Sequence, residues 1–83
     1  MISEIGTIFF NLRLARGWTL EEVAGTSNLS TGEIRFVEQG KAVLGPSIMV
    51  LDRLAKVFNA RCSQIIKKAE DMELEEAKKH AQR

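Results

Sequence analysis

The chain has 83 residues, of which 45% are hydrophobic and 28% charged, with 12 Lys and Arg against 11 Asp and Glu. This composition is typical of one small globular domain and excludes binding of polyanions through bulk charge, so any nucleic-acid surface must come from local segregation of charge. A single cysteine, Cys62, excludes a disulfide framework or a cysteine-based metal site within one chain. No apolar run approaches a membrane span and no signal-peptide pattern is present, so we expect a cytoplasmic protein without membrane contact.

The periodicity predicts an all-α fold of five helices, because apolar residues recur at helical spacing and no sustained alternation of period two occurs. The first helix should run from about Ser3, which can cap it, to Arg16, with Gly17 ending it.

The second and third helices are short, and each begins with a capping box: "TLEE" from Thr19 and "STGE" from Ser30. The second should end near Ser27, because Asn28 tolerates the left-handed conformation of a tight turn. The third should stop before Gly40.

The fourth helix should follow Pro46 and Ser47 and end at about Asn59. The fifth should start at Ser63 and continue into the charged tail "EDMELEEAKKHAQR". Two short capped helices joined by a turn of three or four residues, as in the second and third, are typical of a helix-turn-helix.

The sequence resembles the Cro/CI-type (Xre) helix-turn-helix family, which includes phage repressors and the controller proteins of restriction–modification systems. The resemblance lies in "IGTIFFNLRLARGWTLEEVA", "SNLSTGEIRFVEQGK" and "PSIMVLDRLAKVFNA", and covers about Ile5 to Ile66. It implies a compact five-helix, lambda-repressor-like domain over residues 1–66, with residues 67–83 as a charged C-terminal helical extension.

The resemblance also implies roles for individual residues. Arg13 and Glu38 should form a structural ion pair, and the segment Ser30–Gln39 should be the recognition helix in the major groove of double-stranded DNA. Arg35 is expected to read guanine, and Phe36 to pack on thymine methyls. The expected base contacts are Thr31, Gly32, Arg35 and Phe36, and the expected phosphate contacts are Arg16, Thr19, Ser30, Gln39 and Lys41.

The sequence departs from the family pattern where DNA phosphates should be bound. Leu20 stands where the family often has Gln, and the loop "KAVLGP" is longer than usual and basic only at Lys41. Fewer phosphate contacts predict weaker binding, which a homodimer would partly offset by presenting two recognition helices.

Apolar residues exceed the family pattern, because Ile8, Phe10 and Leu14 stand where such proteins usually carry polar residues. An exposed cluster of this kind indicates an interface, covered by the fifth helix, by a second copy of the chain or by another protein. The candidate interface residues are Phe10, Leu14, Val43, Leu44, Ile65, Ile66 and Met72.

We therefore expect a sequence-specific DNA-binding transcriptional regulator, a repressor or controller, that acts as a homodimer. The alternative is a protein-interaction module of the same fold, an antitoxin or coregulator. Clustering of Phe36 and the Val43–Leu44 loop with Phe10 and Leu14 would favour it, whereas Phe36 beside Arg35 on an open basic surface would favour DNA binding. An enzyme is not expected, because His80 is the only histidine and no nucleophile–base spacing, glycine-rich phosphate loop or metal cluster occurs. No cofactor is expected either.

Overall fold

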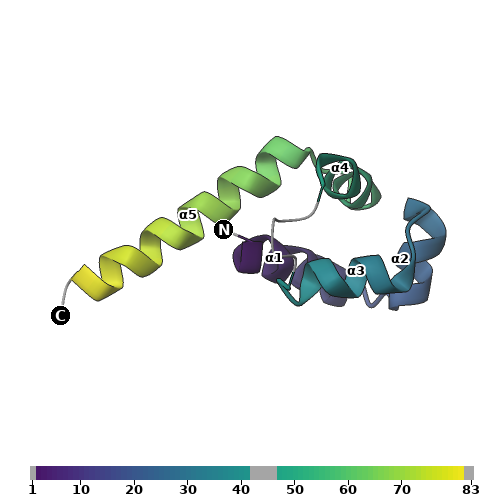
Figure 1. The fold of residues 1–83 in the computed structure, drawn as a ribbon, viewed down its shortest axis with the longest axis horizontal. Coiled ribbons are helices and arrows are strands. Elements are labelled where there is room, and N and C mark those ends of the chain that lie inside the picture. Colours follow the sequence, from purple (N-terminus) through teal and green to yellow (C-terminus); the bar gives the residue numbers. More distant parts are fainter. Residues whose placement is uncertain (1, 42–46, 82–83) are drawn as a thin grey trace.

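The computed structural model describes residues 2–41 and 47–81, and in these ranges it contains five α-helices and no strand, which confirms the predicted all-α class. The first four are α1 (Ile2–Ala15), α2 (Leu20–Ser27), α3 (Thr31–Glu38) and α4 (Ile48–Val57), and the last is α5 (Cys62–Ala81). Figure 1 shows α1 to α4 gathered at one end, while α5 passes α1 and continues beyond it as a rod.

Helix α1 begins one residue earlier than predicted, so Ser3 lies inside the helix and is not its cap. The carbonyl of Ser3 accepts a hydrogen bond of 3.0 Å from the Thr7 hydroxyl, one turn further along. The helix ends at Ala15, followed by Gly17 in the left-handed region with φ of 67°.

Helix α5 also begins one residue earlier than predicted, at Cys62 instead of Ser63. The Arg61 carbonyl accepts the backbone N–H of Gln64 at 3.0 Å, and the Gln64 side chain accepts the Arg61 N–H at 2.8 Å. This reciprocal pair performs the capping that the sequence suggested for Ser63.

The hydrophobic core joins all five helices, and its largest fully buried side chains are Phe9, Val23, Ile34 and Leu54. Ile8, counted in the sequence among the surplus apolar residues, belongs to this core and is 5% exposed. In α5 the buried positions extend past residue 66 to Ala69, which is 0% exposed, so the start of the charged extension also packs on the domain.

Helices α1 and α3 pack very closely, and this contact fixes the position of α3. A Cβ at Gly6 would overlap the Val37 carbonyl oxygen and lie 2.8 Å from that of Glu38. Gly40, with φ of 66°, turns the chain out of α3 so close to α1 that a Cβ there would lie 2.9 Å from the Cα of Ser3. Glycine is therefore required at both places, and α3 is held against the rest of the molecule.

Candidate nucleic-acid interface

Both predicted capping boxes are present, and they place the starts of α2 and α3. Thr19 Oγ1 accepts the Glu22 N–H at 3.1 Å, while the Glu22 carboxylate accepts the Thr19 N–H at 3.1 Å. Ser30 and Glu33 make the same two contacts, also at 3.1 Å. Each helix therefore begins at a defined residue, with its remaining first-turn N–H groups directed outward at a positive dipole end.

The turn between α2 and α3 has the geometry that a helix-turn-helix requires. Asn28 caps α2 in the left-handed conformation with φ of 61°, as predicted, and its N–H donates to the Ala24 carbonyl at 3.1 Å. The buried Ser27 hydroxyl accepts the Leu29 N–H at 3.3 Å, and the Leu29 side chain is buried in the core. The angle between the two helices is thus fixed from both sides of the turn.

Arg13 and Glu38 form a clamp that ties α1 to the end of α3. Arg13 donates from Nε and Nη2 to the two carboxylate oxygens of Glu38 at 2.8 and 3.0 Å, and from Nη1 to the Trp18 carbonyl at 3.1 Å. The two side chains are only 13% and 7% exposed. Hydrogen bonds to Glu38 raise the pKa of Arg13, so its charge is permanent. The Phe10 ring lies against this guanidinium, with Arg13 Cζ 5.5 Å from the ring centroid.

The outer face of α3 carries the four residues expected to read bases. Ile34 and Val37 point into the core, which leaves the opposite side of the helix in solvent. Gly32, Arg35 and Phe36 are exposed, with 49% of Phe36 accessible, and Thr31 is half-buried. The face is therefore open, as major-groove contact requires, and its only cation is Arg35.

A shallow groove of about 330 Å³ runs beside this face and brings together residues for which the sequence predicts separate roles. Phe10, a candidate for a protein interface, lines it together with Arg35, a candidate base reader. Leu20 also lines it, a residue noted in the sequence only as a departure from the family. The apolar and the base-reading residues thus share one surface. The lining residues are Phe10, Arg13, Leu20, Arg35, Glu38 and Gln39.

The expected phosphate contacts are less uniform. Gln39 and Lys41 are exposed at the end of α3. The Ser30 hydroxyl donates to the Glu33 carboxylate at 3.1 Å as well as accepting in the cap, so it has little to offer a phosphate apart from the helix N–H groups behind it. Thr19 is exposed at the start of α2, where its hydroxyl accepts in the other cap.

Arg16 has a structural partner that the sequence did not reveal. Its guanidinium lies 5.5 Å from the centroid of the Trp18 ring and 5.2 Å from that of Phe58. These two rings stack at 5.6 Å, between the exit of α1 and the end of α4. Arg16 is therefore placed over an aromatic pair that seals the core, where a cation–π interaction holds it.

The candidate interface residues differ in exposure. Phe10 and Leu14 are 40% and 54% exposed on α1, whereas Ile65 is 5% exposed in the core and has no surface for the contact that we expected. Ile66 and Met72 are half-buried, and Met72 packs against the core. Val43 and Leu44 lie outside the described residues.

Three exposed apolar residues were missed in the sequence: Ile48 and Met49 at the start of α4, 68% and 62% exposed, and Leu74 in α5, 57% exposed. Their exposure could have been predicted, because Ile48 and Met49 directly follow the helix cap Ser47 and Leu74 lies among charged residues. Exposed apolar side chains therefore also occur on α4 and α5.

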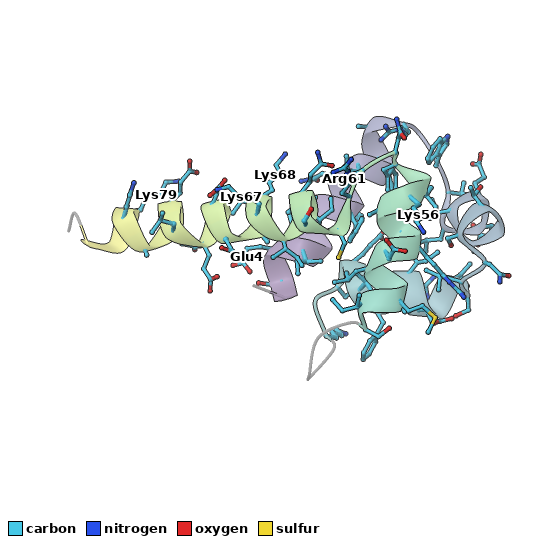
Figure 2. The ribbon with its side chains drawn as sticks, turned by 90° about the horizontal axis from the view of Figure 1, so that it is seen from above. Glu4, Lys56, Arg61, Lys67, Lys68 and Lys79 are labelled. Atoms are coloured by element: carbon cyan, nitrogen blue, oxygen red, sulfur yellow. The ribbon has the colours of Figure 1, made fainter. Side chains whose placement is uncertain are left out.

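Most described cations lie away from α3. Figure 2 shows Lys67, Lys68 and Lys79 along α5, Arg61 just before it and Lys56 on α4. Two of them are in exposed i,i+4 ion pairs, Lys56 with Asp52 at 2.9 Å and Lys67 with Asp71 at 3.2 Å. The charge segregation that a strongly electrostatic nucleic-acid surface would need is therefore modest on the α3 face.

A family model described as helix-turn-helix matches residues 11–65, which include α2, the turn and α3. The chain belongs to the Cro/CI-type helix-turn-helix family. Members of this family place the second helix of the motif in the major groove of DNA, and here that helix is α3.

This Cro/CI-type chain is similar to a protein of Acinetobacter baylyi named "Competence pilus inhibition repressor", with 39% identity over 72 residues. The match covers 87% of this chain and 64% of the relative, so the chain spans less than two thirds of that protein. The described part of this helix-turn-helix chain holds no group of three or more metal-binding side chains, and none of its helices has the length and apolar character needed to cross a bilayer.

Proposed function

We propose that this protein is a sequence-specific DNA-binding transcriptional repressor that acts as a homodimer, with α3 in the major groove. The observation that carries the proposal is the combination of a fixed α3 and an open outer face: the Arg13–Glu38 clamp holds the helix, while Arg35 and Phe36 remain in solvent. The name of the Acinetobacter relative supports repression over activation. Since the proposed target is cellular DNA, a cytoplasmic location is part of the proposal.

The proposed division of labour follows from the chemistry of each side chain. Arg35 presents a planar fork that fits the N7 and O6 acceptors of guanine, while Phe36 presents an apolar surface that fits a thymine methyl. The exposed N-termini of α2 and α3 offer N–H groups to phosphates, and Lys41 adds a charge beyond the opposite, C-terminal end of α3. Thr31 adds a hydroxyl at the first residue of α3.

A homodimer supports this function, because one short recognition helix reads only a few base pairs. Two copies would present their α3 helices about one helical turn apart, which is about 34–36 Å. We propose that the projecting part of α5, with its exposed Leu74, contributes to the contact between copies. Because few cations lie on the α3 face, we expect a shallower dependence of affinity on salt than strongly basic binders show.

A second candidate function is a protein-interaction module of the same fold. It is favoured by one observation, the exposure of Phe10 and Leu14 on α1, with Phe10 lining the groove beside α3. In that case the groove would receive side chains of a partner protein.

A titration separates the two functions. The protein is added to labelled random genomic DNA at about 50 and about 200 mM salt, and bound DNA is measured by fluorescence anisotropy. The proposal predicts binding that weakens with salt, and a solution mass twice that of the 9.3 kDa chain. If bound DNA is absent, or if it does not decrease between the two salt concentrations, the DNA-binding function is wrong and the interaction module remains.

A further inference from the structure

Leu20 is the first residue of α2, so an apolar side chain stands where the helix presents its free N–H groups. The side chain is half-buried and packs partly against the core. Its accessible part lines the groove of about 330 Å³ beside α3. An apolar surface therefore adjoins the backbone groups that are proposed to bind a DNA phosphate.

The groove has an apolar wall and a polar rim. Phe10, 40% exposed on α1, and Leu20 are the two apolar side chains that line it. The clamp between α1 and α3 also lines it, but its guanidinium and carboxylate bond to each other at 2.8 and 3.0 Å. Arg35 and Gln39 supply the rim. The groove therefore suits a group that is apolar itself and has a polar or charged neighbour.

The groove lies between the two parts of the molecule that are proposed to hold DNA. The start of α2 contributes Leu20 on one side, and α3 contributes Arg35 on the other. In a nucleotide the sugar joins the phosphate to the base, so a phosphate at α2 and a base at α3 place a sugar between them. A 2-deoxyribose presents C–H groups to such a wall, whereas a phosphate would lose its hydration there.

We propose that the groove lined by Phe10 and Leu20 receives one deoxyribose of the DNA backbone in each half-site. The inference rests on the proposed DNA-binding function and adds a contact to it. Because the contact is apolar and touches no base, it contributes affinity that depends on neither salt nor base sequence. It thereby offsets the small number of cations on the α3 face.

A matched pair of leucine variants tests the protein side of the contact. Leu20→Ala should weaken binding about fourfold or more, as for losing at least one methylene from an apolar contact. The factor should be the same for a selected duplex and for random genomic DNA, and the same at about 50 and about 200 mM salt. Leu14→Ala is the control, since Leu14 is 54% exposed on α1 and does not line the groove. It should bind as the wild type does.

Modified duplexes test the DNA side with the unaltered full-length protein, so this arm does not depend on the folding of a variant. Arabinose in place of 2-deoxyribose adds a hydroxyl on the major-groove side of the sugar, whereas ribose adds it on the minor-groove side. At one nucleotide of each half-site arabinose should weaken binding about fivefold or more, because a hydroxyl is set against apolar side chains. Ribose there should weaken binding less, and the difference between the two sugars should shrink in Leu20→Ala.

The outcomes separate the sugar contact from DNA binding itself. A loss in Leu20→Ala that is confined to the selected duplex would make Leu20 a base contact, and a loss that changes with salt would make it part of a phosphate site. Either result would overturn the sugar contact. Arabinose and ribose acting alike at every nucleotide, or a Leu20→Ala protein that binds as tightly as wild type, would overturn it as well and leave the groove to a partner protein. In all these cases DNA binding stands, whereas wild-type protein that binds no duplex would overturn both.

Discussion

The Arg13–Glu38 clamp gives the most quantitative prediction, the effect of Arg13→Met on stability. The substitution leaves the Glu38 carboxylate, 7% exposed, without its two guanidinium hydrogen bonds, and leaves the Trp18 carbonyl without its donor. Removing one partner of a buried pair costs about 3–5 kcal/mol, and since 13% of Arg13 remains exposed we expect the lower end, about 3 kcal/mol. In a domain of this size that corresponds to a fall in Tm of about 12–24 °C.

A double-mutant cycle measured by urea unfolding tests the reasoning. Replacing both charges, in Arg13→Met with Glu38→Leu, removes the unpaired charge, so the double variant should be more stable than the sum of the single losses by at least about 2 kcal/mol. Lys56→Ala is the control, because its pair with Asp52 has a similar length of 2.9 Å but side chains 73% and 47% exposed. It should change stability by less than about 0.5 kcal/mol. Single losses that add within about 0.5 kcal/mol would refute the clamp as a coupled unit.

Three further predictions concern single residues. Gly6→Ala should lower the free energy of unfolding by about 2 kcal/mol or more, because the new methyl meets the α3 backbone. Gly17→Ala is the control: nothing lies within 4 Å of its Cβ, so it should lower the free energy of unfolding by only about 1 kcal/mol, through left-handed strain. Equal losses in thermal unfolding would contradict the α1–α3 contact. Ser30→Ala should cost about 1 kcal/mol by removing the α3 cap, and an unchanged urea midpoint would show that the cap is not needed. Arg35→Ala should leave Tm unchanged and weaken discrimination at one base pair by about 1–3 kcal/mol, so an unaltered preference among competing duplexes would mean that another residue reads the base.

Local signals in the sequence predicted most of the fold. The capping boxes at Thr19 and Ser30 are short-range patterns whose geometry depends on neighbouring residues alone, and both are present. The end of α2 at Asn28 was predictable in the same way, because the left-handed conformation of Asn28 is a property of that residue and its turn. The starts of α1 and α5 were each wrong by one residue. At α5 the cap came from the Arg61 carbonyl and the Gln64 side chain, so the serine at 63 was not needed.

Long-range packing could not be predicted from the same signals. Helical spacing places Ile8 and Ile65 on apolar faces, but it does not tell whether the chain's own core or a second molecule covers them, and the packing of the helices buries both. Arg16 keeps its exposed position and its phosphate role stays a prediction, but the sequence did not reveal that its guanidinium lies over the Trp18–Phe58 ring pair. The contact between Arg16 and Phe58 joins residues 42 positions apart in sequence, one after the end of α1 and the other at the end of α4. The reading roles of Thr31, Gly32, Arg35 and Phe36 stay predictions.

The most direct test of the account is to map the surface that DNA touches. Backbone amide signals of the ¹⁵N-labelled protein would be followed by NMR while a selected duplex is added. The account predicts that the largest shifts fall at the start of α2 and along the outer face of α3, including Leu20, Gly32, Arg35 and Phe36. Shifts confined to α5, or to Leu14 and its neighbours on α1 with α3 unchanged, would contradict it.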